Sequence, residues 1–448
     1  MTRKPTYTLI LGAGESGTGA ALLAKAKGVN VLVSDAGMIK PTYKKLLLEN
    51  KIAFEENGHG AGLIAKAREV IKSPGIPDTA EIISTAHAAN IPVISEIEFA
   101  SRYTTATIAA ITGSNGKTTT TGLLAHLMQQ GGLNATAAGN IGQSFSRIVA
   151  EKDYEYYALE LSSFQLEGNY DFRADIAILL NITPDHLDRY NHNFDAYANA
   201  KMRVIQNQRK TDAFVWCSDD ETICRKVEQF MPKAKQYRFS LTQKEDQGAY
   251  LEKNNIIFNI KGETFTMTLE ELALQGKHNI YDSMAAGIAG KLIGLRKESI
   301  KQSLADFRNA EHRLEFVANI HGIEFINDSK ATNINSTWFA LESQYKQVVW
   351  IAGGIDKGND YSKLTELVKQ KVKAIVCLGI DNHQLKEAFN NLVPVMTEVL
   401  TMEEAVNTAY NLADKNDTVL LSPSCASFDL FENYEDRGRQ FKAAVQQL

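Results

Sequence analysis

A glycine-rich stretch between an apolar run and a helix-like segment has residue types that suit a phosphate. It consists of Gly113, Ser114, Asn115, Gly116, Lys117, Thr118 and Thr119. In such a loop the backbone N–H groups and the helix N-terminus face the anion, and Lys117 reaches the terminal phosphates. The Thr118 hydroxyl offers Mg²⁺ the oxygen ligand that this cation prefers. Ile111 stands where the usual pattern has its first glycine, so a chance Lys-Thr in a turn is the alternative. The flanking strand and helix favour a nucleoside triphosphate site.

A second glycine pattern lies near the start of the chain, between two apolar runs typical of strands. It reads Gly12-Ala13-Gly14-Glu15-Ser16-Gly17, and Asp35 follows the second run. An acidic residue about 20 positions after the glycines completes the fingerprint of a βαβ unit that binds a phosphate-bearing ligand. A dinucleotide is the default interpretation, and a nucleotide-sugar would use the same helix N-terminus.

Polar side chains follow two further apolar runs, at the strand ends where open α/β sheets bind ligands. Glu160 ends one run, and Asp185 and His186 follow the next. Alone, they suit a solvated carboxylate and an ordinary loop histidine. Beside a phosphate loop, Glu160 and His186 could both serve a metal, with Asp185 as an alternative ligand. Lys201 would by itself be a solvated charge.

The last third of the chain has its own polar strand ends. Arg313 suits bidentate binding of a phosphate, and Asp328 and Lys330 follow the next predicted strand. Those two could form a surface ion pair of little energetic weight, but the density of polar residues after a strand favours contact with a ligand. Lys357 and Ser427, in further glycine- and serine-rich turns, are candidates to bind a carboxylate, and turn formation is their alternative role.

Composition bounds the class of protein. The chain has 448 residues, enough for about three domains, and is 44% hydrophobic with 30 glycines and 9 prolines. The formal net charge of −5 gives no electrostatic footprint for nucleic acid or an anionic membrane. Four scattered cysteines suit a reducing cytosol, and we see no signal peptide or membrane span. We therefore expect a cytoplasmic α/β protein.

The order of the apolar runs predicts three domains, each built on an open, mostly parallel sheet. We expect a Rossmann-like N-terminal domain over residues 1–98, a central phosphate-loop domain over 99–308 and a Rossmann-like C-terminal domain over 309–448. The continuous apolar runs at 156–161 and 176–180 are typical of parallel strands buried on both faces. Alternating stretches between about 213 and 268 predict added antiparallel strands.

Together these residues resemble the Mur ligase family over essentially the whole chain and all three predicted domains. The motifs that carry the resemblance are Gly113–Thr118, Gly139–Gly142, Leu159–Leu166, Asp185–Arg189, His312-Arg313, Asn327–Asn333 and Ser422–Ser427. The phosphate loop and the His-Arg pair are common to the wider superfamily. The runs Glu-Leu-Ser-Ser-Phe-Gln-Leu, Asp-Ser-Lys-Ala-Thr-Asn and Ser-Pro-x-Cys-Ala-Ser resemble those members that add D-glutamate.

The resemblance implies a ligase of cytoplasmic peptidoglycan precursor synthesis, which serves cell-wall biogenesis, cell shape and cell division. The implied reaction is ATP-dependent ligation of D-glutamate to UDP-N-acetylmuramoyl-L-alanine through an acyl phosphate. It implies ATP and Mg²⁺ at two sites as cofactors, the two small-molecule substrates as partners, neither nucleic acid nor membrane, and a monomer.

The resemblance also implies roles for single residues. Catalytic roles fall to Lys117, Glu160, His186 and Lys201, and metal binding to Thr118, Glu160, His186 and Lys201 if its amine is carbamylated. ATP contacts fall to Gly113, Ser114, Asn115, Gly116, Lys117, Thr118, Thr119, Asn279, Arg313, Asp328 and Lys330. Contacts to the UDP-substrate fall to Glu15, Ser16, Asp35, Ser73, Asn140 and His186, and those to D-glutamate to Thr332, Lys357, Ser427 and Phe428.

Three alternatives remain open. Another amide ligase of the superfamily would add a diamino acid to a muropeptide or glutamate to a folate, because pocket specificity can depend on a few side chains. A non-catalytic UDP-sugar binding protein would have no need of the set Lys117, Glu160, His186 and Lys201. A nicotinamide dehydrogenase would rest on the first glycine pattern alone and leave the rest of the chain unexplained.

Overall fold

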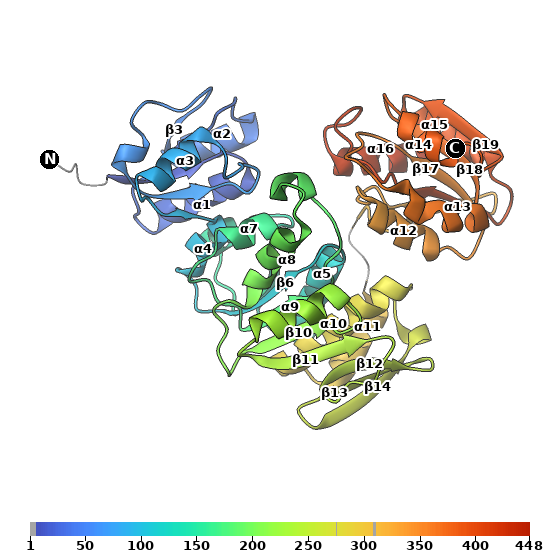
Figure 1. Ribbon diagram of the computed structural model, residues 1–448, viewed down its shortest axis with the longest axis horizontal. Coiled ribbons are helices and arrows are strands. Elements are labelled where there is room, and N and C mark those ends of the chain that lie inside the picture. The colour runs from blue at the N-terminus through green and yellow to red at the C-terminus, as the bar shows by residue number, and fades with distance from the viewer. Residues whose placement is uncertain (1–5, 275, 308–310) are drawn as a thin grey trace. The chain divides into compact units, whose positions relative to one another are not determined.

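The computed structural model describes residues 6–274, 276–307 and 311–448, and within them the chain forms three sheets (Figure 1). The described residues divide into two compact units. One holds residues 6–273 and 281–307, and the other holds 274, 276–280 and 311–448. The division falls within helix α10, Lys277–Ile293. The first unit contains the first two sheets, and the second unit contains the third.

The first sheet has five strands, all parallel, in the order β3-β2-β1-β4-β5. Its strands are β1 (Tyr7–Leu11), β2 (Val31–Ser34), β3 (Ala53–Glu55), β4 (Ala67–Lys72) and β5 (Val93–Ile94). Its helical segments are α1 (Glu15–Ala26), α2 (Pro41–Glu49), the short η1 (Ile64–Lys66), α3 (Glu81–Ala88) and α4 (Glu96–Ser101). Because β1, β2 and β4 run in the same direction, the segments that follow them meet at one edge of the sheet.

The second sheet has nine strands in the order β14-β13-β12-β11-β10-β9-β6-β8-β7. They are β6 (Thr107–Thr112), β7 (Ala135–Gly139), β8 (Tyr156–Glu160), β9 (Ile176–Leu179), β10 (Ala213–Cys217), β11 (Lys235–Ser240), β12 (Gly248–Glu252), β13 (Asn255–Ile260) and β14 (Glu263–Thr268). The helical segments are α5 (Lys117–Gln130), α6 (Phe145–Glu151), α7 (Ser163–Glu167), η2 (Leu187–Tyr190), α8 (Phe194–Met202), η3 (Arg203–Ile205), α9 (Glu221–Phe230), η4 (Leu269–Glu271), α10 and α11 (Lys297–Asp306).

The expectation of antiparallel strands between about 213 and 268 is only partly right. Strands β12, β13 and β14 pair antiparallel, but β10 pairs parallel with β9 and β11, and β11 pairs parallel with β12. Helix α8 lies between β9 and β10 in the sequence and helix α9 between β10 and β11, and a helical crossover returns the chain to the same end of the sheet. The central sheet is therefore parallel from β7 to β12.

The third sheet has six strands in the order β15-β16-β20-β17-β18-β19, and only the β15–β16 pair is antiparallel. The strands are β15 (Glu315–Ile320), β16 (Ile323–Asn327), β17 (Val348–Ala352), β18 (Val372–Leu378), β19 (Val395–Val399) and β20 (Thr418–Leu421). The helical segments are α12 (Ile334–Glu342), η5 (Tyr361–Leu364), α13 (Thr365–Lys371), α14 (His383–Phe389), α15 (Met402–Leu412) and α16 (Tyr434–Val445). The expected α/β class with mostly parallel sheets is confirmed.

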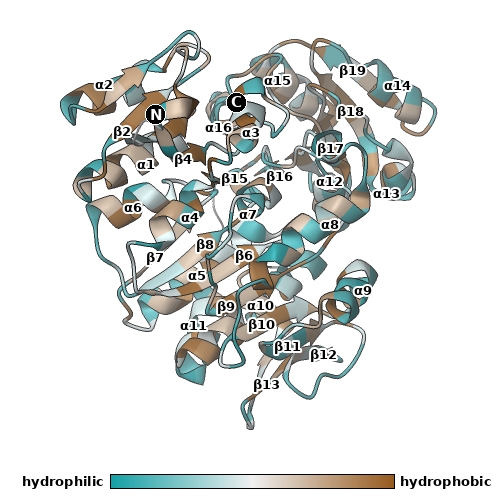
Figure 2. Ribbon diagram, turned by 60° about the vertical axis from the view of Figure 1, so that its left-hand side comes forward, coloured by the Kyte–Doolittle hydropathy of each residue, from teal (hydrophilic) through white to brown (hydrophobic). Residues whose placement is uncertain are grey.

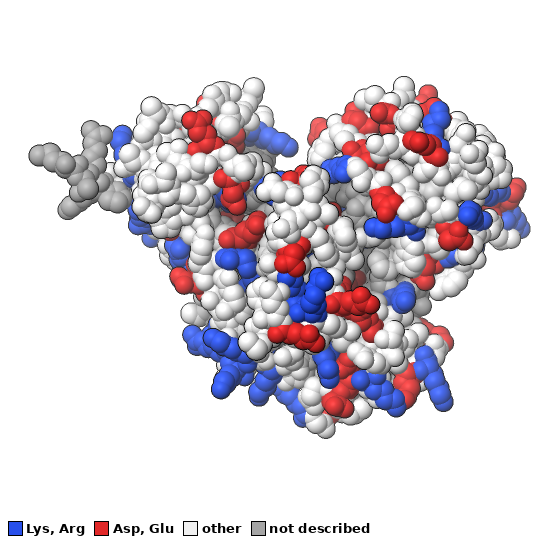
Figure 3. Space-filling model, viewed as in Figure 1, with Lys and Arg blue, Asp and Glu red and all other residues white. Residues whose placement is uncertain are grey.

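Burial explains why the central strands read as apolar runs. Every residue of β9, β17 and β20 is buried, as expected for parallel strands covered on both faces. Helices carry both hydrophobic and hydrophilic residues (Figure 2), as expected of elements that cover a sheet. On the face drawn in Figure 3, Lys and Arg alternate with Asp and Glu rather than gathering in one patch.

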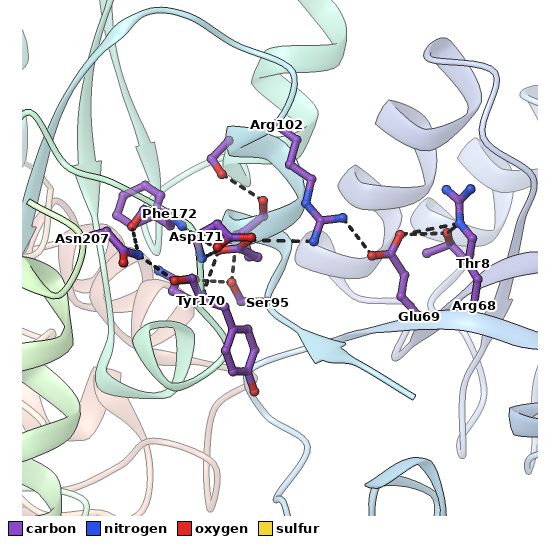
Figure 4. A network of polar contacts seen from close by, with 12 residues as sticks. Thr8, Arg68, Glu69, Ser95, Arg102, Tyr170, Asp171, Phe172 and Asn207 are labelled. Atoms are coloured by element: carbon purple, nitrogen blue, oxygen red, sulfur yellow. Dashed lines mark hydrogen bonds and ion pairs between the residues drawn. The ribbon is translucent and has the colours of Figure 1, made fainter. Parts of the chain in front are cut away.

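The first and second sheets are joined by buried carboxylates on α4. Glu98 Oε2 accepts the backbone N–H groups of residues 170, 171 and 172 at 3.0, 3.1 and 2.8 Å. Arg102 donates to Glu69 of β4 at 2.8 Å and lies 3.8 Å from Glu98 (Figure 4). The other α4 carboxylate, Glu96, accepts the Ser146 N–H of α6 at 2.9 Å. Burial raises the pKa of Glu96 to about 7.

The two predicted domain boundaries can be located relative to the described elements. The boundary at 98/99 lies inside α4, the helix that joins the first two sheets. The boundary at 308/309 lies outside the described residues. Among the described helices, none is long and apolar enough to cross a membrane.

Candidate active site

The predicted phosphate loop connects β6 to α5. Gly116 has a left-handed φ of 82°, and a side chain there would meet the Asp282 carboxylate. The loop is tied to the residues after β9: Ser114 N–H donates to the Asn181 carbonyl at 3.0 Å, and Asn115 N–H to Asn181 Oδ1 at 2.8 Å. Helix α5 then starts at Lys117, with Thr118 and Thr119 buried in its first turn. Strand, loop and helix therefore lie as the sequence predicted.

Two lysines converge on one carbonyl of this loop. Lys117 Nζ donates to the Gly113 carbonyl at 2.8 Å and to the Ser114 carbonyl at 2.8 Å. Lys201 Nζ, from α8, donates to the same Gly113 carbonyl at 2.8 Å. The two lysines are far apart in the sequence, on α5 and α8, and the fold brings both amines to the start of the loop.

Lys201 is unusual because its amine is almost wholly buried, with 2% of the residue exposed. Burial, and next the neighbouring positive charge of Lys117, hold the pKa of the Lys201 amine well below its usual value, and Asp185 opposes this. The amine also lies 4.6 Å from the centre of the Tyr197 ring. Burial disfavours the charged form of this amine, so Lys201 loses its proton more readily than an exposed lysine does.

Glu160 is the buried carboxylate beside the phosphate loop. It ends β8, and Ile111 is its partner on β6. Its Oε1 accepts Asn140 Nδ2 at 3.0 Å, whereas Oε2 is buried without a hydrogen-bond partner among the described residues. A buried carboxylate oxygen without a partner is costly unless a cation or donor binds it. Glu160 therefore fits the role of a metal ligand, with Asn140 holding its orientation.

His186 is not part of a complete set of metal ligands among the described residues. The residue is exposed, its Nε2 is 3.7 Å from Asp185 Oδ2, and its ring meets Phe164 edge-on at 5.4 Å. His186 also has a left-handed φ of 52°. Within the part of the chain that the structure describes, no three His, Cys, Asp or Glu side chains form a group that could hold a metal ion. A metal here would need other oxygen donors, such as the Thr118 hydroxyl or a modified Lys201.

The residues predicted for the UDP-substrate gather around the turn after β1. Asp35, directly after β2, accepts the Ala13 N–H at 2.7 Å and the Gly37 N–H at 2.9 Å. Ser73, directly after β4, donates to the Gly12 carbonyl at 3.3 Å. Ser16 lies in the first turn of α1, partly exposed. These three residues come from three neighbouring strand ends, where a ligand would bind.

Glu15 has a structural partner in the second sheet's domain. Its Oε1 accepts the Ser144 N–H at 3.0 Å, just before α6, and its Oε2 lies 3.5 Å from Arg147. The carboxylate therefore ties the N-terminus of α1 to α6. These contacts indicate a structural role for Glu15, which connects the domain of the first sheet to that of the second.

In the second unit, Asp328 is the buried carboxylate at the end of β16. Its Oδ2 accepts Ser422 Oγ at 2.9 Å, and its Oδ1 accepts the Leu314 N–H at 3.3 Å. Burial raises the pKa of Asp328 to about 7, against the opposing charge of Arg313. Lys330 lies with its amine 5.1 Å from the Tyr434 ring centre.

The start of α10 lies near Arg313 within the same unit. Asn279 is buried there, and the neighbouring His278 packs its ring against Phe339 at 5.2 Å. Burial, and next the charge of Arg313, lower the pKa of His278 to about 4. The predicted nucleotide residues Asn279, Arg313, Asp328 and Lys330 therefore all lie in the second unit.

The residues predicted for D-glutamate belong to three strand-end loops of the third sheet. Thr332 follows β16 and is half-buried, Lys357 follows β17 and is exposed, and Ser427 follows β20 and is buried. Phe428 is 68% exposed. Ser424 N–H donates to the Ala331 carbonyl at 2.9 Å, so the loops after β16 and β20 are bonded to each other.

Sequence reasoning missed several residues that hold these loops. Asn181 and Tyr197 brace the phosphate loop, the latter through Ser114 at 2.9 Å. Arg437 of α16 is buried and donates to the Ser329 and Cys425 carbonyls at 2.8 and 3.2 Å. Burial lowers the pKa of Arg437 to about 10. A lone Arg on a polar helix gives no sequence signal of such a role.

Comparison with known proteins decides the family. Models of the Mur ligase MurD-like N-terminal domain, the Mur ligase middle domain and the Mur ligase glutamate ligase domain match residues 6–95, 111–290 and 312–425. The UDP-N-acetylmuramoylalanine–D-glutamate ligase of Bacteroides fragilis is 53% identical over 98% of this chain and 99% of its own length. The chain belongs to the Mur ligase family. The enzyme of the same name from Porphyromonas gingivalis is 52% identical over the whole of both chains.

Solved Mur ligase structures share the fold. The UDP-N-acetylmuramate–alanine ligase MurC from Thermotoga maritima has a TM-score of 0.63 at 17% identity and covers 98% of this chain and 99% of its own. A pseudomurein peptide ligase type C from Methanothermus fervidus has a TM-score of 0.62 at 17% identity over the same shares. The Mur ligase family to which the chain belongs is ATP-dependent and generally requires Mg²⁺.

Proposed function

We propose that this Mur ligase joins D-glutamate to UDP-N-acetylmuramoyl-L-alanine, converting ATP to ADP and phosphate, in peptidoglycan precursor synthesis. The observation that carries the proposal is similarity above 50% identity over almost the whole length to enzymes named for this reaction. The alanyl carboxylate attacks the γ-phosphorus and ADP leaves. The D-glutamate amine then attacks the acyl carbon, phosphate leaves, and the amine proton is released.

The chain's own cations favour the first step. A carboxylate and a triphosphate repel each other, so positive charge must lie at the point of attack. Lys117 is bonded to loop carbonyls, and a phosphate in the loop would offer its amine a stronger, charge-assisted bond. The N-terminus of α5 adds the partial positive charge of its backbone N–H groups. These groups would orient the γ-phosphate toward the alanyl carboxylate that attacks it.

We propose two Mg²⁺ sites for this loop. Thr118 would serve one, and Glu160, His186 and a carbamylated Lys201 would serve the other. Bound Mg²⁺ would screen the charge between the two anions. The partnerless Oε2 of Glu160 and the buried amine of Lys201, whose pKa is lowered by burial, support this set. Carbamylation joins the nitrogen of the deprotonated lysine amine to the carbon of CO₂ and releases one proton, which leaves an anionic group with two oxygen atoms that can bind a metal.

For the UDP end we propose Ser16, Asp35 and Ser73 around the turn after β1, with Asn140 and His186 nearer the reacting end. We propose that Glu15 acts there indirectly, by holding α1 against α6. Asn279, Arg313, Asp328 and Lys330 would serve the nucleotide. Thr332, Lys357, Ser427 and Phe428 would border the D-glutamate site, with Lys357 pairing with a carboxylate.

We further propose that the enzyme works in the cytoplasm as a monomer. The scattered cysteines are free among the described residues, as suits a reducing compartment. Gel filtration with light scattering on the purified chain would test the monomer. A mass of twice 49.5 kDa would contradict it.

The decisive experiment measures ATP-dependent phosphate release with UDP-N-acetylmuramoyl-L-alanine and D-glutamate, L-glutamate, L-lysine or meso-diaminopimelate. We expect turnover with D-glutamate alone. Turnover with another amino acid would keep the ligase chemistry and overturn the amino-acid assignment. Retained ATP binding without turnover on any amino acid would favour the folate ligase or the non-catalytic UDP-sugar binder.

A further inference from the structure

The loop after β17 is fixed by a carboxylate that sequence reasoning assigned no role. Asp356 Oδ1 accepts the Gly358 and Asn359 N–H groups at 2.7 and 2.9 Å. Its Oδ2 accepts the Tyr361 hydroxyl at 2.7 Å. With its amide nitrogen facing the carboxylate, Gln384 of α14 donates to both oxygens at 2.9 and 3.0 Å. Bonds to an ionised acceptor are about twice as strong as neutral ones, so Asp356 closes the loop firmly.

The same loop is bonded to the loop after β20. Asn359 Nδ2 donates to the Ser424 carbonyl at 3.1 Å. Ile355 and Ala426 exchange two backbone hydrogen bonds, at 2.9 and 3.1 Å. Gly354, with φ 124°, lets the two backbones approach, since a side chain there would collide with the Ala426 carbonyl. The backbone on either side of the exposed loop tip is therefore set by the neighbouring loop.

The buried side chain of Tyr361 also supports this loop, through its hydrogen bond to Asp356. It is 6% exposed, its ring packs edge-on against Phe389 at 5.6 Å, and burial raises the pKa of its phenol. Its hydroxyl therefore remains a proton donor to Asp356 over the working pH range. Its hydroxyl also lies 3.4 Å from Cys425 Sγ, and burial raises the pKa of that thiol to about 11.

The loop has room to move if these bonds are broken. A cavity of about 360 Å³ lies beside it, lined among others by Asp356, Tyr361, Gln384 and Asp429. Lys357, between Asp356 and Gly358, is exposed and makes no ion pair among the described residues. Ser427 directly follows Ala426, the bridge partner of Ile355. The bonds of Asp356, Asn359 and Tyr361 thus set where Lys357 lies relative to Ser427.

We propose that Asp356, Asn359 and Tyr361 form a clasp that positions Lys357 and Ser427 for the carboxylates of D-glutamate. They are positioning residues, because none of them needs to touch the amino acid. The inference rests on the proposed function of Lys357 and Ser427. An amide at 356 would offer only one acceptor oxygen, so it would lose either the Tyr361 bond or the backbone bonds.

The test measures KM for D-glutamate, ATP and UDP-N-acetylmuramoyl-L-alanine, with kcat, in Tyr361→Phe and Asp356→Asn. Tyr361→Phe removes one hydroxyl and keeps the ring on Phe389. We expect KM for D-glutamate to rise about tenfold in Tyr361→Phe and about thirty-fold in Asp356→Asn. KM for the other two substrates should stay within about twofold, because the clasp lies in the loop that carries Lys357.

The matched control is Asp360→Asn, an exposed carboxylate four positions along the same loop. Among the described residues its side chain contacts Ser362 of its own turn and Lys363. It should leave all three KM values unchanged. A double-mutant cycle separates positioning from general support of the fold. In a Lys357→Ala background, Tyr361→Phe should raise KM for D-glutamate by clearly less than the tenfold expected in the wild-type background, because of the two residues that the clasp positions only Ser427 is left.

Each outcome has a distinct meaning. An unchanged KM for D-glutamate in a folded Tyr361→Phe, with active wild-type protein, would overturn the clasp alone. Equal increases in all three KM values, or full additivity with Lys357→Ala, would overturn it in favour of a purely structural role. Wild-type protein that does not consume D-glutamate would overturn the proposed function and the clasp with it. If Asp356→Asn does not fold, Tyr361→Phe carries the test.

Discussion

The phosphate loop after β6 and the loop after β17 have similar sequences of structural features, but different hydrogen bonds hold their backbones in place. Each follows a buried parallel strand, turns at glycines of positive φ and carries one lysine. In the phosphate loop both Lys117 and Lys201 donate to the Gly113 carbonyl, so the loop backbone itself holds the two amines in place. In the second loop Lys357 is exposed, and the fixing is done by Asp356, Asn359 and Tyr361.

The difference teaches how each loop suits its ligand. A triphosphate carries enough charge to draw a lysine away from a carbonyl, so an inward-bonded cation can be kept until the anion arrives. An amino acid carries less charge, and a long exposed lysine would lose much rotamer freedom on binding it. A rigid backbone beneath Lys357 limits that loss. The predictions below test whether the first loop works through its lysines and the second through its support.

The largest effect is expected from Lys117→Ala. The loop backbone should keep its shape, because Asn181 and Lys201 also hold it. Loss of the cation at the γ-phosphate should lower kcat at least about a thousand-fold. Phosphate release measures the rate, and circular dichroism checks the fold. Substantial remaining ligation would mean that the loop does not bind the reacting phosphate through Lys117.

A smaller effect is expected from Glu160→Gln. The glutamine oxygen can still accept Asn140, but the neutral amide is a weaker ligand for Mg²⁺ than the carboxylate. The Mg²⁺ concentration for half-maximal activity should rise about 10- to 100-fold. Titrating Mg²⁺ in the phosphate-release assay measures it. Glu155→Gln, an exposed carboxylate just before the same strand, is the control, and an equal Mg²⁺ requirement in both variants would contradict a metal role for Glu160.

The phosphate loop could be predicted from the sequence because the residues that form it are close together in the chain. Its glycines, Lys117 and Thr118 are neighbours in the chain, and the flanking strand and helix show as an apolar run and a helical pattern. Lys201 has no local pattern, and only the family resemblance indicated a role for it. Its burial and its bond to Gly113 depend on how α8 packs on the loop.

The second loop could not be predicted in the same way. The segment Asp356-Lys357-Gly358-Asn359-Asp360 is what an ordinary turn contains, so nothing distinguishes the Asp356 bonds from turn formation. Tyr361, Ser424 and Gln384 join it from three other elements. The parallel pairing of β10 and β11 was missed as well. Strand β10 is a fully buried apolar run, typical of a parallel strand, but β11 alternates polar and apolar residues and so resembles an antiparallel strand.

A further prediction concerns Lys357→Ala, which removes the cation but leaves the clasp in place. KM for D-glutamate should rise about 30-fold, since a pairing with a partly exposed carboxylate is lost. KM for ATP should not change. In the phosphate loop the corresponding substitution lowers kcat, so the two lysines should differ in which constant they affect. A fall in kcat with an unchanged KM for D-glutamate would contradict this division.

The smallest effect tests the support of the third-sheet loops through pH. Asp328 bonds the loop after β20 through Ser422, and burial raises its pKa to about 7. The folded state therefore binds a proton that the unfolded state, with a pKa near 3.8, has released between these values. Stability from this group is present at low pH and is lost as pH rises toward 7.

Asp328→Asn mimics the protonated side chain at every pH, so it should remove that loss. Arg313 and Arg437, which face Asp328, keep their charge throughout this range and cannot produce the same change. The free energy of unfolding of the variant, relative to wild type, should rise by about 2–3 kcal/mol between pH 5 and pH 8. Urea denaturation of the nucleotide-free protein at several pH values measures it, with the exposed Glu403→Gln of α15 as control. A difference that stays constant with pH would mean that Asp328 does not take up a proton on folding and accepts the Ser422 hydroxyl as a carboxylate throughout this range.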